Sequence, residues 1–457
     1  MRTESVNFLV MGFEVAYKEA MTSEPGTESP PKVLRLRQPN RSQRMLRVEC
    51  PEDLVPEDHP VRVIWAVTGR LDLSAFYTSI RSVQGEAGRG ATDPRLLVAL
   101  WLYAATQGVG SARELNRLCQ EHRAYQWLCG GVSLNYHTLS DFRVGYGAQL
   151  DELLTQVLAT LVEKKLVSVW RISQDGTRVR ACVGSSSFRR RDRLHKLYQQ
   201  ARAHVEELKQ QVEDPALSAQ VSARQRAARQ RAAEERERRL EQALAQLPEL
   251  EQKKLQRKVA KGKAPDLTQL RVSTTDAQAR VMRMSDGGYR PAVNVQLACD
   301  PQSRAIVGVE VSCEGSDAGH SEPLRRQVEA RTGQKVKEQL LDGGYLNLQE
   351  IERAEQEQLT LYVPAKVPKN PQKRKHPYEP RRGDSAGVRA WRQRMGSEAG
   401  QSIYKLRASS IETVNADLKS YRGLHRLSVR GLAKVRCVVL WSALAYNLLH
   451  FATALLG

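Results

Sequence analysis

The chain has 457 residues, and 71 Lys+Arg against 51 Asp+Glu give it a formal net charge of +20. A hydrophobic fraction of 41% excludes a wholly disordered chain, and the length predicts two to four domains. Seven scattered cysteines without a CxxC pair exclude a small disulfide-bonded secreted scaffold and indicate free thiols in a reducing compartment. The positive charge favours a polyanionic partner, either nucleic acid or an anionic membrane surface.

Signals for membrane insertion are weak at both ends of the chain. Residues 8–11 form one short apolar run, without the longer hydrophobic region and cleavage site of a signal peptide. Residues 437–457 form the longest apolar segment, which Ser442, Asn447 and His450 interrupt. We interpret this segment as a buried helix rather than a tail anchor, and we expect no membrane association.

The N-terminal third is expected to contain an extension and a helical domain. Residues 1–45 include a Ser-, Pro- and Glu-rich stretch and predict a poorly ordered extension. Residues 46–165 predict an all-α domain, because helix starts and apolar helical periods follow one another along it. Asp93 before Pro94 is a typical helix start, and Ser111 caps a later helix.

The last helices of this domain have two interpretations. Gly130 and Gly131 turn the chain into a polar helix that includes Arg143, which is the order of a helix-turn-helix DNA reader. In that interpretation Arg143 contacts DNA. A small helical bundle without a DNA role has the same pattern, so both interpretations stay open.

A set of thiols and imidazoles in this region is a weak zinc candidate. The set comprises Cys119, His122, Cys129 and His137. Its spacing matches none of the usual paired-ligand patterns, so side chains buried in a helical core explain it better than zinc does.

The positive charge is concentrated in two segments. Residues 189–263 hold 20 basic and 11 acidic residues, and residues 366–394 hold 10 and 2. These segments account for +17 of the +20, so the remainder of the chain is nearly neutral. Two basic appendages on a neutral body are therefore expected, rather than a uniformly basic protein.

The first appendage, residues 189–263, predicts an inserted helical arm. A narrow apolar stripe precedes a stretch rich in Ala, Arg, Glu and Gln, in which residues 224–241 have almost no large apolar side chain. A helix that is polar all round either projects into solvent or lies along a charged partner. A solvated arm and a clamp on DNA phosphates are both consistent with this pattern.

The second appendage predicts a basic, Pro-rich loop over residues 364–400. Several prolines exclude regular structure there, and Lys373, Arg374 and Lys375 lie among them. The loop suits a nucleic-acid backbone, with a flexible solubilising loop as the alternative.

From residue 167 the pattern changes from helices to alternating strands and helices. The predicted strands are residues 167–173, 293–298, 305–312, 336–341 and 359–363. The predicted helices are residues 321–331, 348–356, 402–421 and 431–449. We expect residues 166–188 and 264–457 to form one α/β domain that the arm interrupts.

Two of the predicted strands end in an Asp-Gly pair, at Asp175 and at Asp342. Open α/β sheets bind ligands at the carboxyl ends of their strands. Two carboxylates on neighbouring strands would repel, so they either share a proton or hold divalent cations, and oxygen ligands favour Mg²⁺ or Mn²⁺. For each acid alone an ordinary turn is the alternative, and Asp286-Gly287 shows how common the pair is.

A third carboxylate would complete a two-metal site, and Glu412 is the best candidate. On the predicted helix 402–421, Glu412, Asn415 and Lys419 share one face. Glu412 could bind a metal ion while Lys419 contacts a phosphate. Two ions about 4 Å apart can activate the attacking oxygen and stabilise the leaving oxygen of a phosphoryl transfer. A solvated surface glutamate is the alternative.

The order of elements around these acids resembles a ribonuclease-H-like arrangement, and residues 46–450 resemble bacterial insertion-sequence transposases of the DDE type. The motifs that carry the resemblance are residues 51–60 (PEDLVPEDHP), 175–181 (DGTRVRA), 287–296 (GGYRPAVNVQ), 341–345 (LDGGY), 430–432 (RGL), Asn447, and the signature Tyr404, Arg407, Glu412 and Lys419. Four residues separate Arg407 from Glu412, where a common form of the signature has three.

The resemblance implies a ribonuclease-H-like mixed sheet flanked by helices, preceded by an all-α DNA-binding domain. It implies an enzyme that binds the terminal inverted repeats of its mobile element, cleaves phosphodiester bonds there, and transfers the freed 3′-hydroxyl to target DNA. Asp175, Asp342 and Glu412 would hold two Mg²⁺ or Mn²⁺ ions, and Tyr404, Arg407 and Lys419 would contact DNA. A homodimer or larger assembly on double-stranded DNA, in the cytoplasm and associated with the nucleoid, would be expected.

Two other functions compete with this interpretation. The first is a catalytically inactive or domesticated DNA-binding relative, against which the presence of all three carboxylates argues. The second is a structure-specific nuclease of the same fold, such as a junction resolvase. The helical N-terminal domain and the basic appendages favour binding to specific DNA ends instead.

Overall fold

The computed structural model describes residues 41–42, 44, 48–82, 90–213, 222–259, 266–366 and 377–457. The chain divides into two units, Met1–Glu49 and Cys50–Gly457, and the second is described below. The predicted extension, residues 1–45, lies almost entirely outside the described residues. Lys373, Arg374 and Lys375 of the predicted basic loop also lie outside them.

The N-terminal part of the second unit is helical, as its sequence pattern predicts. The elements are η1 (Pro51–Leu54), α2 (Pro60–Thr68), α3 (Ser74–Tyr77), α4 (Pro94–Thr106), α5 (Ala112–Glu121), α6 (Arg123–Cys129), α7 (Tyr136–Gly145) and α8 (Gly147–Glu163). Asp93 caps α4, since its carboxylate accepts a hydrogen bond from the Arg95 amide at 2.8 Å. Ser111 caps α5 in the same way, and His122 caps α6 through its Nδ1.

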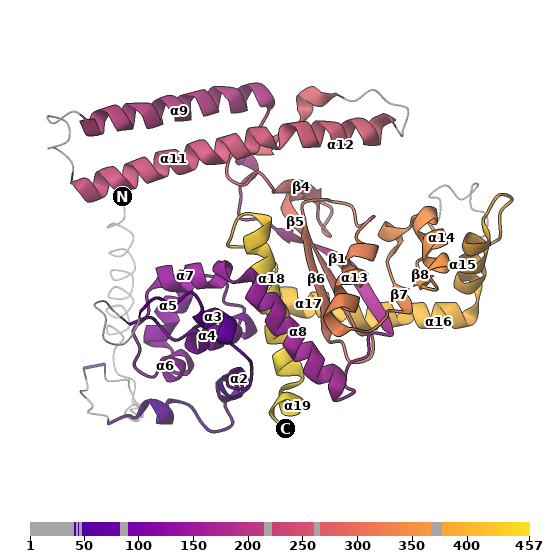
Figure 1. The fold of residues 1–457 in the computed structure, drawn as a ribbon, viewed down its shortest axis with the longest axis horizontal. Coiled ribbons are helices and arrows are strands. Elements are labelled where there is room, and N and C mark those ends of the chain that lie inside the picture. The colour runs from indigo at the N-terminus through magenta and orange to yellow at the C-terminus, as the bar shows by residue number, and fades with distance from the viewer. Residues whose placement is uncertain are drawn as a thin grey trace, which may run out of the picture. The chain divides into compact units, whose positions relative to one another are not determined.

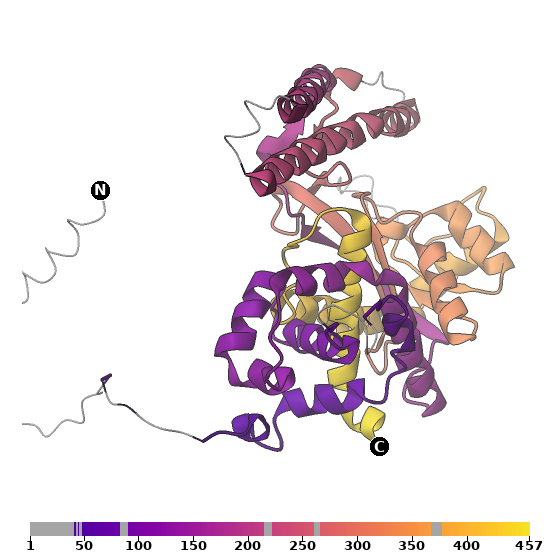
Figure 2. The ribbon, with the colours of Figure 1, turned by 60° about the vertical axis from the view of Figure 1, so that its left-hand side comes forward.

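The predicted arm is a pair of long helices inserted after the first strand of the sheet. The predicted range, residues 189–263, contains α9 (Arg191–Glu213), α11 (Ala223–Ala245) and α12 (Leu247–Val259). The short elements at its base are η2 (Ser185–Ser187), β2 (Phe188–Arg189), η3 (Leu267–Gln269) and β3 (Val272–Ser273). The helices α9 and α11 lie side by side in both views (Figure 1, Figure 2). Leu194 and Ala201 of α9 pack against Leu240 and Ala243 of α11, which leaves most of the polar surface to solvent. The short antiparallel pair β2–β3 closes the base of the arm.

One mixed sheet forms the centre of the α/β part. Its strands are β1 (Arg171–Arg180), β4 (Arg280–Arg283), β5 (Tyr289–Cys299), β6 (Ile306–Ser312), β7 (Glu338–Leu340) and β8 (Thr360–Tyr362). The order is β4-β5-β1-β7-β8, and β6 also pairs with β5. The pairs β1–β5, β4–β5 and β5–β6 are antiparallel, whereas β1–β7 and β7–β8 are parallel. This mixed α/β architecture is consistent with the expected ribonuclease-H-like fold.

Helices from the C-terminal half cover the sheet and join it to the N-terminal helices. They are α13 (Ser321–Thr332), α14 (Leu348–Gln356), α15 (Ala386–Gly396), α16 (Glu398–Arg407), the π-helical segment Ala408–Glu412, α17 (Thr413–Ser420), α18 (Leu432–His450) and α19 (Ala452–Leu456). The helix α13 packs on β5 and β6, and the π-helical segment packs on β1 and β5. Figure 1 shows α18 between the N-terminal helices and the sheet.

The long apolar segment near the C-terminus is a buried helix, as expected. Among the described residues, α18 is the one helix long and apolar enough to cross a membrane, and 67% of that window is buried inside the protein. It contacts α4, α7, α8 and β6. The Asn447 amide, which interrupts its apolar sequence, bonds both the backbone N–H and the C=O of Ile306 at 2.9 Å. The polar interruptions therefore serve packing against the sheet.

Two details of the predicted secondary structure were wrong. Asp175 does not end its strand, because β1 continues to Arg180 through pairing with the long strand β5. The predicted loop over residues 364–400 is shorter, because α15 spans Ala386–Gly396 and α16 begins at Glu398. Ser385 and Ser397 cap these helices beyond the last proline, so the Pro-rich composition controls only the first half of the segment.

Candidate functional site

Asp175 on β1 and Asp342, two residues beyond the end of β7, lie at matching positions relative to these adjacent parallel strands. Ser173 of β1 is paired with Leu340 of β7, and this is the last pair of the parallel ladder. Asp175 lies two residues after Ser173, and Asp342 lies two residues after Leu340. Since neighbouring strands lie about 4.8 Å apart, the register brings the two carboxylates to the same end of the ladder. The sheet therefore creates the acidic pair that the two Asp-Gly motifs predict.

Asp175 is a largely buried carboxylate with two specific partners. Its Oδ1 lies 2.8 Å from Arg407 Nη2, and its Oδ2 accepts a hydrogen bond from Asn415 Nδ2 at 3.0 Å. Burial raises the pKa of Asp175 to about 6, and the charges of Asp342 and Asp317 add to this effect while Arg407 opposes it. Burial thus keeps the pKa of Asp175 raised, although Arg407 is the charge that acts on it most strongly and in the opposite direction.

Asp342 is held by the turn that follows β7. Its Oδ1 accepts a hydrogen bond from the Gly344 amide at 2.7 Å and so caps the 3₁₀ turn Gly343–Tyr345. The Asp342 side chain is half-buried. The Asp-Gly-Gly sequence therefore forms a turn, and the predicted role of Asp342 as a site residue stays a prediction.

Glu412 is the last residue of the π-helical segment, and Arg407 directly precedes that segment. Arg407 Nη1 lies 2.7 Å from Glu412 Oε1, and the Glu412 side chain is 53% exposed. A π-helical turn accommodates one residue more than an α-helical turn and brings residues five apart together. Four residues separate Arg407 from Glu412, and the π-helical turn accommodates the additional residue. The two side chains are therefore still in contact.

Ser410 anchors the π-helical segment to the sheet. Its hydroxyl lies 3.0 Å from Ser173 Oγ and 2.6 Å from the carbonyl oxygen of Leu406. Ser173 belongs to the last pair of the parallel ladder and lies two residues before Asp175. The contact therefore holds the π-helical segment close to Asp175. The position of Glu412 relative to β1 therefore depends on two buried serines.

Arg407 is a cation shared by the acidic residues of the site. It bonds Asp175 and Glu412, and its Nε is buried without a hydrogen-bond partner among the described residues. Burial opposes its charged form, but Asp175, Tyr404, Asp342 and Glu412 together raise its pKa. In this arrangement Arg407 separates Asp175 from Glu412.

The other predicted DNA contacts lie in different surroundings. Lys419 lines a cleft of about 520 Å³ together with Asp175, Arg178 and Arg283. Burial lowers the pKa of Lys419, while the nearby Asp175 opposes that shift. Tyr404 lies half-buried on α16, and burial raises its pKa.

Arg143 is buried on α7, away from these residues. Its Nη1 donates to Ser428 Oγ at 3.0 Å, and its guanidinium stacks on the Trp101 ring. Burial lowers the pKa of Arg143 to about 10. These contacts join α7 to the loop before α18, and the predicted contact of Arg143 with DNA stays a prediction.

Asp317 is a fourth acid of the site, which the sequence analysis missed. It is 5% exposed and lies on the loop between β6 and α13. Its carboxylate accepts hydrogen bonds at 2.8 Å from Arg178, Asn294 and Gln296. Nothing in the local sequence distinguishes it from an ordinary loop aspartate, because its partners come from β1 and β5.

A network of buried amides lies beneath these carboxylates. Gln174 Nε2 donates to Gln296 Oε1 at 3.1 Å, and Gln339 Nε2 donates to Gln174 Oε1 at 2.7 Å. The Tyr345 hydroxyl donates to Gln296 Oε1. The three glutamines come from β1, β5 and β7, so the network ties together the strands that carry the acids. Buried networks of this kind hold a site rigid when their members are paired.

The donor set matches the chemistry of a hard divalent cation. The acids supply only oxygen ligands, and burial, followed by the nearby charges of Asp342 and Asp317, raises the pKa of Asp175. In the described part of the chain, however, no three His, Cys, Asp or Glu side chains converge as a metal group. The carboxylate of Glu412, the third predicted ligand, bonds Arg407.

Two family models match separate parts of the chain. Residues 262–448 match the family model of a transposase DDE domain, and residues 49–144 match that of a transposase domain (DUF772). No match was found among curated proteins or among solved structures. Asp342 and Glu412 fall within the first match, whereas Asp175 precedes it on the other side of the arm. The two matches support an insertion-sequence DDE transposase, and hence a nuclease-type enzyme.

Proposed function

We propose that this protein is the transposase of an insertion sequence, which binds the terminal inverted repeats and catalyses cleavage and strand transfer into target DNA. The supporting observation is the arrangement of Asp175, Asp342 and Glu412 around Arg407, on three elements far apart in the sequence. Asp175 gives this proposal its strongest support. It lies outside residues 262–448, which match the transposase DDE domain, and yet it shares Arg407 with Glu412 of that domain.

In this proposal the three carboxylates hold Mg²⁺ or Mn²⁺, with two ions per site. When bound, the ions would activate the attacking oxygen and stabilise the leaving oxygen. Asn415 orients Asp175 through its 3.0 Å hydrogen bond, and Lys419 presents a positive charge in the cleft beside it. Arg407 and Tyr404 would contact DNA phosphates once the substrate is in place. Pairing of two DNA ends would require a homodimer or larger assembly, in the nucleoid-associated fraction of the cytoplasm.

The test uses DNA that carries both flanks of the gene, where the inverted repeats are expected. Asp175→Asn should lower Mg²⁺-dependent cleavage of these ends on the order of 10³-fold, because loss of a metal ligand removes several kcal/mol of transition-state stabilisation. DNA binding should survive. The matched control is Asp286→Asn, which alters an exposed Asp-Gly pair that bonds Arg290. Equal cleavage by both variants would remove Asp175 from the site.

Two outcomes distinguish the competing functions. Tight binding of the flanking DNA without nicking in Mg²⁺ or Mn²⁺ would identify a catalytically inactive relative. Cleavage of branched DNA that lacks the flanking sequence would identify a structure-specific nuclease.

A further inference from the structure

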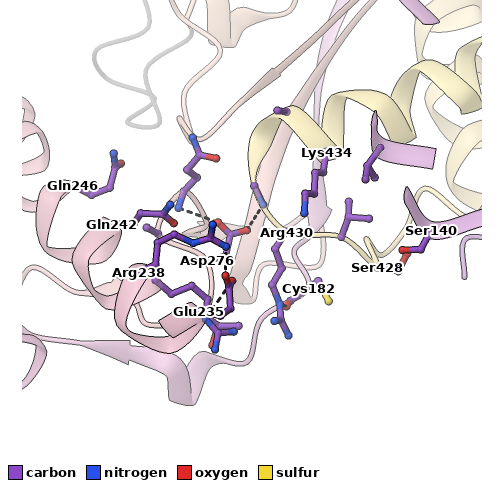
Figure 3. Close-up of a pocket in the computed structure, with 18 of the residues that line it drawn as sticks. Ser140, Cys182, Glu235, Arg238, Gln242, Gln246, Asp276, Ser428, Arg430 and Lys434 are labelled. Carbon is purple, nitrogen blue, oxygen red and sulfur yellow. Dashed lines mark hydrogen bonds and ion pairs between the residues drawn. The ribbon is translucent and has the colours of Figure 1, made fainter. Parts of the chain in front are cut away.

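A second polar groove lies between the arm, the N-terminal helices and the start of α18. Its volume is about 920 Å³, and it shares no lining residue with the cleft beside Asp175. Figure 3 shows Arg238, Gln242 and Gln246 of α11 on one side and Arg430 and Lys434 on the other. Ser140 and Ser428 extend the lining toward α7. The groove is thus lined by α7, α11 and the start of α18, which are far apart in the sequence.

The acids of the groove are mostly occupied by partners within it. Asp276 Oδ2 accepts a hydrogen bond from the Gly431 amide at 2.9 Å, at the first turn of α18. Glu235 pairs with Arg238 and with Arg239 on its own helix. Asp141 remains as an exposed carboxylate on α7. The charge of Glu235 is thus neutralised within the lining, whereas Asp276 is hydrogen-bonded to backbone amides and keeps its charge.

The cations at the start of α18 are available to a ligand. Arg430 and Lys434 are exposed, and neither forms an ion pair within the described part of the chain. Arg430 Nε donates to the carbonyl oxygen of Cys182 at 3.2 Å, which directs its side chain across the groove. The Gln242 side chain opposite is also exposed. Cations combined with neutral amides and hydroxyls are the donors that proteins use for DNA phosphates.

We infer that this groove binds the phosphodiester backbone of duplex DNA and grips the substrate at a distance from the cleavage site. The inference rests on the proposed function and names one surface with which the protein would contact its DNA substrate. The strand β1 runs from Asp175 to Arg180, and Cys182 of the groove follows it closely. At about 3.3 Å per residue, the groove lies roughly 20 Å from Asp175. That distance corresponds to about six base pairs of B-form DNA.

The experiment measures binding of a fluorescein-labelled 30-base-pair duplex of arbitrary sequence to the full chain in EDTA, across a series of salt concentrations. Each phosphate contact contributes about 0.9 to the slope of log K against log salt concentration. The double variant Arg430→Glu, Lys434→Glu should therefore reduce this slope by about 2. The neutral double variant Arg430→Gln, Lys434→Gln should also reduce this slope. It replaces the charge-reversed variant in the experiment if that protein does not fold.

The matched control is Lys335→Glu, Lys337→Glu, which changes the net charge by the same amount. Both lysines are exposed, and Lys337 contacts Trp170 at the other end of β1 from the groove. The control should leave the slope unchanged. If groove and control variants have equal slopes while the wild type binds, the groove inference fails and the proposed function stands. If the wild type does not bind this duplex, the groove inference fails, and the cleavage test on the flanking DNA still decides the proposed function.

Alkylation of cysteines gives an independent readout of position. Cys182 lines the groove, whereas Cys313 does not, and both thiols are half-buried. Saturating duplex should slow N-ethylmaleimide labelling of Cys182 several-fold in the wild type and leave Cys313 unchanged, as followed by peptide mass spectrometry. Unchanged labelling of Cys182 on the bound protein would overturn the inference.

Discussion

Gly176 lies directly against the buried carboxylate of Asp317. A Cβ atom added to Gly176 would lie closer than 3.0 Å to Asp317 and also to Gln296. Gly344, which follows the other acidic motif, has Asp342 and Asp317 as the nearest neighbours of its missing Cβ. The glycines that follow the two predicted acids therefore make room for a third buried acid. Gly176 therefore serves packing inside β1, where the chain does not turn. The segment Asp342–Gly344 both turns the chain and leaves room for Asp317.

Gly176→Ala is therefore expected to destabilise the fold by about 1–3 kcal/mol, the usual cost of overpacking a buried site. Displacement of Asp317 should also weaken Mg²⁺-dependent cleavage. The control is Gly184→Ala, whose added Cβ would meet only Ser186 Oγ at 3.5 Å, with an ordinary backbone φ of −86°. Urea unfolding measures both variants. Equal stability of the two proteins would show that Asp317 can move without cost.

Arg407 and a divalent cation are expected to compete for the same carboxylates. Arg407→Gln should bind Mn²⁺ several-fold more tightly than the wild type, because the cation no longer displaces a guanidinium from Asp175 and Glu412. Electron paramagnetic resonance of free Mn²⁺ measures this without any activity assay. The control is Arg422→Gln, which removes a 2.8 Å ion pair with Asp417. Weaker Mn²⁺ binding by Arg407→Gln would contradict competition.

The raised pKa of Asp175 has a consequence for stability in the absence of metal. Because the folded-state pKa of about 6 exceeds the ordinary value near 3.9, folding favours the protonated form. The stabilisation is complete below about pH 4 and is lost as the pH rises through 6. Asp175→Asn should remove this loss, on the order of 2 kcal/mol. Urea unfolding in EDTA between pH 4.5 and 7.5 measures the difference, and identical pH profiles would refute it.

Arg331 joins the α/β part to the N-terminal helices. Its side chain is 3% exposed and bonds Asp151 of α8 at 2.5 Å and the Val307 carbonyl oxygen at 2.9 Å. Arg331→Ala should lower the free energy of unfolding by about 3 kcal/mol, because it leaves buried polar groups unpaired. The control on the same helix is Arg326→Ala, which removes an exposed ion pair with Glu322. This substitution is expected to change the free energy of unfolding by about 0.5 kcal/mol or less. Similar losses in both variants would mean that the Arg331 contacts contribute little.

Much of the fold follows from local patterns in the sequence. The apolar periods predict the helices α13, α14 and α18 and the strands β5 and β6 to within a few residues. The arm is helical because its composition favours helix wherever it is placed. Asp175, Asp342 and Glu412 were predicted as site residues because apparent strand ends and helix faces are local features. The structure brings Asp175 and Glu412 together on Arg407.

Other features depend on contacts between residues far apart in the chain, and only the tertiary structure decides them. Pairing with β5 extends β1 past Asp175, and Asp317 joins the site through partners more than twenty residues away. The contact between Ser410 and Ser173 spans 237 residues and sets the position of Glu412. The sequence by itself predicted Asp175, Asp342 and Glu412 as candidate site residues from local patterns, and that assignment stays a prediction. Their mutual distances, their shared guanidinium and the basic groove depend on packing, which no local pattern encodes.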